Sequence, residues 1–353
     1  MDPVTHLLVG AVVGRAVAGR KLGFTQAACW GAVAAELPDI DVLVSFAAAD
    51  EPLDMLVRHR GVTHSLWFPP VVGLLSGFMV SRLALLQTRA SPWTWVLLFT
   101  AALLSHPLLD FCTHYGTQLL APFSDRRFSV PALPIVEPLY TGIFLVGLLV
   151  ATWLVRRSRA RAAELACVLT LVASTAYLLL GLRLNTAAEN WARKDLAGRS
   201  ADVAVVYAFP TLLQLPYRRV VARTAGEDWV GFVSMAHPCP IAWDHRVRDD
   251  QALVGLLRQS YGGRIFEWFA NGLTAAYSDD RRVFLADLRF GFLPDVLSSL
   301  WRLEADVGGE QHPLGTARFV QSPRPATSAA NILELLRAAY PRNCDEPVGE
   351  FEY

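Results

Sequence analysis

Six apolar stretches in the first half of the chain limit what it can fold into. They cover approximately residues 4–19, 23–37, 66–86, 93–113, 137–155 and 165–183. The last four are about 19–21 residues long, enough for a helix to cross a hydrocarbon core roughly 30 Å thick. The first two, of about 15 residues, would have to be tilted, interfacial or packed inside a bundle. Because only 18% of the 353 residues are charged, we predict a polytopic α-helical membrane protein with about six membrane segments.

The character of the sequence changes after Asn185. Residues 200–353 hold most of the Asp and Glu, and their alternating runs DVAVVYAF, YRRVVART and RRVFLADLRF are typical of strands. Helical patterns lie near residues 250–260 and 330–340. We therefore expect a helical membrane domain over residues 1–190 and, over residues 200–353, an α+β domain with a small antiparallel sheet.

Lysine and arginine in the short connections indicate the orientation, because cytoplasmic loops carry an excess of both. The basic residues of these connections are Arg15, Arg20 and Lys21, then Arg82 and Arg89, then the RRSRAR run at 156–161. If all three connections are cytoplasmic, six crossings leave both termini outside. The domain at residues 200–353 is then extracytoplasmic, together with the connections 38–65 and 114–136.

Seven side chains that can bind metal fall at the expected outer ends of the first four segments. They are His6, Asp39, Asp41, His59, His64, His106 and Asp110. The last two are four residues apart, which puts both on one helix face. Random placement would leave some such residues at the inner ends, and none lies there. The shared level predicts one site built from four separate places in the chain.

Histidine and carboxylate side chains are ligands for zinc, manganese and iron, and ionisable groups inside membrane segments usually mark function. Seven such groups exceed what one tetrahedral ion needs. We therefore expect one or two divalent ions, zinc first, with Asp39 or Asp41 as a general base or bridging ligand. The net charge of zero gives no indication of nucleic-acid binding.

Taken singly, these residues have simpler explanations. His6 suits a helix N-terminus, and PDID is good turn chemistry. His59 and His64 share no helix face and would suit a membrane interface, whereas His106 and Asp110 could simply hydrogen-bond within their helix. Their coincidence at one level is what favours a metal site.

Three arginines are candidates for binding an anionic substrate. Arg60 lies between two presumed ligands, and a guanidinium cannot ligate a cation, so we expect it to face substrate and to stabilise negative charge in the transition state. Arg126 and Arg127, in PFSDRRFS, could clamp a phosphate beside an outward-facing site. Lipid head-group binding explains these two equally well.

Two cysteines lie in the C-terminal region. Cys239, in HPCPIAW, and Cys344, in PRNCDEP, are the only ones there. An oxidising compartment would permit them to pair.

The motifs THLLVGAVVGR, LPDIDVL, HRGVTHSL and SHPLLDFCTHYGTQLLAPFSDRRFS occur in this order within about residues 1–155. Together they resemble the membrane-bound metal-dependent hydrolases of the LexA-regulated inner-membrane type. The resemblance implies a multi-pass protein of the bacterial inner membrane, a hydrolytic activity and the same seven motif positions. Glu137, in VEPLY, stands where that family often has an aspartate before proline. A more distant likeness is to zinc-dependent phospholipase C.

We therefore expect a membrane-embedded metal-dependent hydrolase that acts on an ester or a phosphoester. The depth of the site favours a membrane lipid or a lipid-linked substrate. A non-catalytic metal-binding scaffold or regulatory protein remains the alternative, and no protein partner is indicated. A transporter would need polar residues through to the inner side, and the polar set stops at the outer level.

Overall fold

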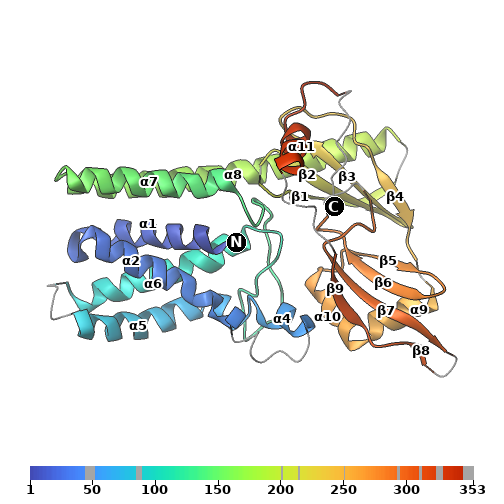
Figure 1. Ribbon diagram of the computed structural model, residues 1–353, viewed down its shortest axis with the longest axis horizontal. Coiled ribbons are helices and arrows are strands. Elements are labelled where there is room, and N and C mark those ends of the chain that lie inside the picture. Colours follow the sequence, from blue (N-terminus) through green and yellow to red (C-terminus); the bar gives the residue numbers. More distant parts are fainter. Residues whose placement is uncertain are drawn as a thin grey trace. The chain divides into compact units, whose positions relative to one another are not determined.

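The computed structural model describes residues 1–43, 52–84, 90–199, 202–213, 215–249, 251–291, 295–309, 312–322 and 329–344. The chain forms two compact units (Figure 1). The first is Met1–Asp50 with Val57–Leu180, and the second is Glu51–Leu56 with Gly181–Tyr353. Arg89, one of the basic residues expected on the cytoplasmic side, lies outside the described residues.

The first unit is a bundle of helices that run alternately away from one end and back to it (Figure 1). Its elements are α1 (Pro3–Leu22), α2 (Phe24–Glu36), the short η1 (Leu37–Asp39) and η2 (Val62–His64), α5 (Phe68–Ala84), α6 (Pro92–Phe111), α7 (Pro138–Arg156) and the first part of α8 (Ala160–Ala197). The boundary between the units falls within α8 and also within α4 (Pro52–Arg58).

Fewer helices than expected can cross a membrane. Among the described residues, α6, α7 and α8 are long and apolar enough, and a fourth crossing results if the bent pair Leu53–His64 and Phe68–Leu83 is one span. The prediction of about six membrane segments is therefore not supported by the described residues. α2 has only 13 residues, and the polar His6, Arg15 and Arg20 dilute the apolar character of α1.

α1 and α2 pack instead as a tight hairpin. A Cβ atom added at Gly31 would lie 2.2 Å from the carbonyl oxygen of Gly10, so only glycine allows the helices to approach this closely. Arg15 is buried in the bundle and ties the hairpin to α7. Its Nε donates to the carbonyl of Phe24 at 3.2 Å, and its Nη1 donates to Thr152 Oγ1 at 2.8 Å.

The second unit is an α+β domain with two antiparallel sheets rather than a single small one. The first sheet has the order β1 (Val203–Pro210), β2 (Tyr217–Thr224), β3 (Glu227–Ser234), β4 (Asp244–Val247). The second has the order β5 (Thr274–Ser278), β6 (Arg282–Asp287), β7 (Trp301–Gly309), β8 (His312–Leu314), with β9 (Arg318–Gln321) also paired to β7. The helices are α9 (Ala252–Gln259), α10 (Tyr261–Phe269) and α11 (Ala329–Ala339).

The C-terminal part of α8 supplies one side of this domain's core. Ala188, Ala192 and Leu196 pack with residues of the first sheet such as Val206 and Val220. The loop after β3 is joined to the segment after α11 by a disulfide between Cys239 and Cys344, whose Cα atoms are 5.4 Å apart. The pairing that the sequence permitted is therefore present.

Candidate metal centre

The predicted ligands come together at one end of the helical bundle, each placed by the beginning or end of an element. His6 lies in the first turns of α1, Asp39 ends η1 and His64 ends η2. His106 and Asp110 lie in the last turns of α6. The polar level expected from the sequence is thus a real cluster in space.

Local sequence signals set these element ends. Asp2 caps α1 by accepting a hydrogen bond from the Thr5 backbone N–H at 3.0 Å, and Pro3 occupies the first helical position, where its missing N–H costs nothing. α2 ends at Glu36, and Pro38, which cannot donate a helical hydrogen bond, is the second residue of the tighter turn η1. That turn carries Asp39 to the centre.

Four ligand atoms converge in what we call the quartet: Nε2 of His64, Nε2 of His106, Oδ1 of Asp39 and Oδ2 of Asp110. The two nitrogens are 3.1 Å apart, and Asp39 Oδ1 lies 3.3 Å from each. Asp110 Oδ2 lies 3.4 Å from His64 Nε2 and 3.6 Å from His106 Nε2. Ligands held tetrahedrally around zinc at about 2.0–2.1 Å are about 3.3–3.4 Å from one another. The spacing of the quartet fits such an ion.

The hydrogen bonds of the two imidazoles leave a lone pair on each quartet nitrogen. His106 Nδ1 lies 2.6 Å from the carbonyl oxygen of Ala35, which can only accept, so Nδ1 carries the proton. His64 Nδ1 lies 3.0 Å from the Thr63 hydroxyl, which itself donates to Asp41 Oδ2 at 2.8 Å. Two lone pairs and two carboxylate oxygens at these distances repel one another unless a metal ion, or a proton on one of the nitrogens, lies between them. The donor set therefore fits a divalent metal.

The two oxygens of Asp110 make different contacts: Oδ2 belongs to the quartet, whereas Oδ1 contacts groups in a surrounding layer. Oδ1 lies 2.9 Å from Arg60 Nη2 and 3.3 Å from His6 Nε2, and the amino group of Met1 also contacts it. The His6 ring stacks on His106 with centroids 3.6 Å apart. Neither His6 nitrogen makes a hydrogen bond within the described part of the chain. His6, His106 and Asp110 each offer one ligand atom within 4.8 Å of the others, so His6 is placed to serve a second ion.

Asp41 lies beside the quartet rather than in it. Its Oδ1 is 3.0 Å from His59 Nδ1, and its Oδ2 accepts hydrogen bonds from Thr63 and from the Arg60 backbone N–H at 3.0 Å. Arg60 adopts a φ of 63°, a region that non-glycine residues rarely occupy. His59 also belongs to a group with Asp39 and His64 whose ligand atoms lie within 4.8 Å of one another.

The carboxyl groups of Asp39 and Asp41 have lowered pKa values. Burial alone would raise both, but contacts with His106 and His64 outweigh burial at Asp39, so its pKa falls below the usual range. Contacts with His59 and His64 lower the pKa of Asp41 in the same way. Ionised carboxylates are the form that binds a cation or orients a ligating imidazole.

The Arg60 side chain contacts Asp110, a residue of the quartet, rather than an open space. Its side chain is buried, its Nη1 donates to Thr113 Oγ1 at 3.1 Å, and its guanidinium carbon lies 4.5 Å from the centre of the Tyr115 ring. With Nη2 on Asp110, the guanidinium holds that carboxylate in place. The substrate-facing orientation expected from the sequence is not what this geometry supports.

The remaining predicted residues lie in other surroundings. Arg127 is buried and donates through Nη2 to the carbonyls of Tyr115 and Gly116 at 2.9 and 2.8 Å, so it supports the loop. Arg126 is exposed, with its guanidinium carbon 5.2 Å from the Phe128 ring centre. Buried Glu137 caps α7, accepting hydrogen bonds from the backbone N–H of Leu139 at 3.3 Å and from the Tyr177 hydroxyl at 3.1 Å.

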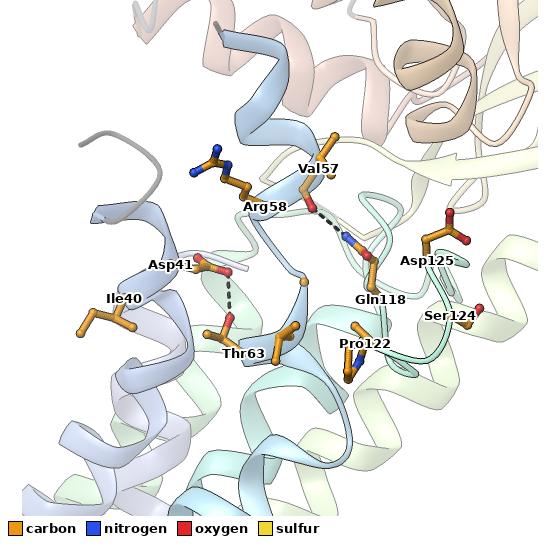
Figure 2. Close-up of a pocket in the computed structure, with 12 residues that line it drawn as sticks. Ile40, Asp41, Val57, Arg58, Thr63, Gln118, Pro122, Ser124 and Asp125 are labelled. Carbon is orange, nitrogen blue, oxygen red and sulfur yellow. Dashed lines mark hydrogen bonds between the residues drawn. The ribbon is translucent and has the colours of Figure 1, made fainter. Parts of the chain in front are cut away.

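A pocket of about 430 Å³ opens beside Asp41 (Figure 2). It is lined by Ile40, Asp41, Val57, Arg58, Gly61, Val62, Thr63, Gln118, Ala121, Pro122, Ser124 and Asp125. Gln118 fixes the far wall: its backbone N–H donates to the Arg60 carbonyl at 3.0 Å, and its Nε2 donates to the Val57 carbonyl at 2.9 Å. Sequence analysis did not predict this pocket.

Comparison with known proteins places the chain in a family. The model of the YdjM inner membrane protein family matches residues 1–185. The chain belongs to this family. It is also 38% identical over 131 residues to the inner membrane protein YbcI of Escherichia coli, an alignment that covers 36% of this chain and 71% of YbcI. It is 28% identical over 147 residues to the uncharacterized protein YfhP of Bacillus subtilis, covering 39% of this chain and 42% of YfhP. No solved structure matches.

Every residue of the quartet lies within the part of the chain that the YdjM family model matches, whereas both β-sheets lie beyond it. Membership establishes a protein of the inner-membrane type, as the resemblance implied. Neither the family description nor the relatives' names state a reaction.

Two further side chains, at or next to the centre, were not predicted from the sequence. Thr63 stands next to His64 in the motif, but its role as a relay to Asp41 depends on the fold. Glu36 ends α2, and its buried Oε1 makes no hydrogen bond within the described residues. Burial, and then the nearby charge of Asp39, raise the pKa of Glu36 to about 7. In the sequence, only its position directly before LPDID associated Glu36 with the predicted site.

Proposed function

We propose that this chain is a membrane-embedded metal-dependent hydrolase that cleaves an ester or phosphoester bond of a membrane lipid or lipid-linked molecule. The quartet is the observation that carries the proposal. The distances from its two nitrogens to each other and to its two oxygens, 3.1–3.6 Å, suit tetrahedral coordination, and the other nitrogen of each imidazole is engaged. The Asp39 side chain is 22% exposed, so the cluster has an open side. Catalytic zinc sites keep such an opening, whereas structural sites are closed.

The residues around the quartet have distinct roles in this proposal. His64, His106, Asp39 and Asp110 would hold the ion, which when bound supplies an activated water and polarises the bond to be cleaved. His59, oriented by Asp41, is a partly exposed imidazole with a carboxylate behind it, the arrangement that moves protons in many hydrolases.

The first test is metal content and hydrolysis of the protein purified in detergent. We expect His64→Ala and His106→Ala to lose the bound metal while the protein remains in the membrane. His245→Ala, at an exposed histidine of the C-terminal unit, is the matched control and should keep it. Hydrolysis of phospholipids or of a generic phosphodiester should require metal and disappear in the first two variants.

Two outcomes would count against the proposal. Full metal occupancy in His64→Ala or His106→Ala would contradict the site. Metal bound by the quartet, with no hydrolysis of any ester or phosphoester tested, would favour the non-catalytic scaffold.

We also propose that the metal centre and the C-terminal domain face the outside of the inner membrane. The bundle end opposite the quartet carries Arg20, Lys21, Arg82 and the basic run at 156–161, as cytoplasmic loops do. α8 begins at that basic end and returns to the end that holds the quartet, and the second unit follows it in the chain (Figure 1).

A further inference from the structure

The pocket beside Asp41 is lined by no residue of the quartet. About half of its lining is apolar, from Ile40, Val57, Val62, Ala121 and Pro122, and the rest is polar. Its volume of about 430 Å³ lies within the roughly 300–1,000 Å³ of small-ligand sites. A cavity lined by both apolar and polar side chains suits an amphiphile better than a fully polar solute.

The pocket is adjacent to an exposed aromatic pair. Trp67 and Phe123 meet edge to face with centroids 6.0 Å apart, and they are 54% and 79% exposed. Phe123 directly follows the pocket residue Pro122, and Trp67 directly precedes α5. Exposed tryptophan and other aromatic side chains beside apolar helices are typical of the membrane–water interface.

A second aromatic level lies at the other end of the bundle. Trp93, at the start of α6, and Trp153, near the end of α7, are both more than half exposed. The 20 residues of α6 separate the two levels by about 30 Å, the thickness of a hydrocarbon core. The pocket mouth therefore lies where acyl chains meet head groups.

The segment Asp39–Asp41 joins this pocket to the quartet. Asp39 contributes to the quartet, whereas Ile40 and Asp41 line the pocket. Figure 2 shows Ile40, Asp41 and Thr63 on the side of the pocket opposite Gln118 and Pro122. A molecule that reaches past this three-residue segment can present its polar group at Asp39 while its apolar part stays in the pocket.

We infer that the pocket binds the hydrocarbon chain of a membrane amphiphile, which enters sideways from the interface past Trp67 and Phe123. The inference rests on the proposed function for the reaction but not for the binding. For a short-chain amphiphile taken up from water, each methylene that the pocket buries strengthens binding roughly fourfold, so its affinity should rise with chain length until the pocket is full. A water-soluble diester without a chain would lack this contribution.

Photo-crosslinking tests the inference without requiring turnover. The probe is a lysophosphatidylcholine with a diazirine in its acyl chain, added to the purified protein in nanodiscs, with labelled peptides mapped by mass spectrometry. We expect labels in segments 57–63 and 118–125. Val62→Trp should fill the pocket and reduce this labelling at least about tenfold. Val71→Trp, at a similarly exposed valine of α5 outside the pocket, should leave it unchanged.

Zinc content of Val62→Trp, measured on the same sample, shows whether the quartet is intact. Loss of pocket labelling with zinc retained supports the inference. Labelling confined to the lipid-facing helices, or pocket labelling that Val62→Trp and Val71→Trp affect equally, overturns it. Failure of metal binding or of hydrolysis in the wild-type protein would overturn the proposed function and leave the labelling result standing.

Discussion

At the scale of single residues, Arg60 contacts a different group in the structure from the one expected from the sequence. The sequence places it between His59 and His64 and suggests a substrate contact, whereas its guanidinium holds Asp110, a quartet carboxylate. Replacing it would remove one of the cations that hold this buried carboxylate, the Met1 amino group being another, and would free the carboxylate to turn. We expect Arg60→Ala to weaken zinc affinity about 10–100-fold, the usual effect of losing a partner of a metal ligand. Competition with a chelator measures this.

Two further variants accompany the Arg60→Ala measurement: Arg60→Lys tests for rescue, and Arg126→Ala is the control. The lysine variant should recover part of the affinity, because it restores the charge but not the planar fork. Arg126 is exposed, so its alanine variant should bind zinc normally. If Arg60→Ala bound zinc as tightly as wild type and lost only hydrolysis, Arg60 would return to the substrate-binding role.

The seven candidate residues could be selected from the sequence because polar residues stand out at the ends of apolar segments, and the structure brings them together at one end of the bundle. Their division into a quartet and a surrounding layer could not. That division depends on which imidazole nitrogen meets a carbonyl, as His106 Nδ1 meets Ala35, and on the turn that directs Asp41 to His59 and Thr63. Both are set by contacts between residues far apart in the chain.

At the scale of elements, the sequence pattern distinguished helices from strands. It did not distinguish helices that span the membrane from helices that only pack inside the bundle. The run at 4–19 is apolar enough to suggest a crossing, yet in α1 glycine and alanine mediate close contact with α2. The strand patterns at β1, β2 and β6 were read correctly. Their division into two sheets was not foreseen, because strand partners are chosen by tertiary packing rather than by alternation.

The close approach of α1 and α2 predicts that replacing Gly31 destabilises the protein. In Gly31→Ala the new methyl group would clash with the Gly10 backbone and push α2 away, costing about 1–3 kcal/mol of unfolding free energy. Zinc affinity should fall as well, because α2 leads into Asp39. Gly142→Ala in α7 is the control: its Cβ meets nothing within 4 Å, so helix propensity should make it neutral or slightly stabilising.

Thermal unfolding in detergent and zinc titration of both variants measure these effects. Equal unfolding temperatures for Gly31→Ala and Gly142→Ala would show that the hairpin tolerates separation, and the close approach of α1 and α2 would lose its importance for the metal centre.

At the scale of the whole molecule, the proposed side of the C-terminal domain rests on the direction in which the first part of α8 runs. The number of crossings expected from the sequence is not supported by the described residues, but the side assigned to that domain depends only on the end of the bundle to which α8 returns. The Cys239–Cys344 disulfide agrees with an oxidising compartment. In a reducing one, the same two cysteines and His237 would form a candidate metal-binding group instead.

Cysteine accessibility in spheroplasts separates these two situations. With Cys29, Cys112 and Cys167 replaced by alanine, an impermeant maleimide should modify nothing before reduction, and both Cys239 and Cys344 after it. The reason is that the disulfide protects both thiols and the domain faces outward. Ser158→Cys, added to the same background with Cys239 and Cys344 also replaced, lies in the basic connection and should react only once the membrane is broken. The opposite pattern would come from two samples: labelling of Ser158→Cys in intact spheroplasts, and no labelling of Cys239 and Cys344 after reduction in the protein that retains them. That pattern would reverse the orientation and place the metal centre on the cytoplasmic side.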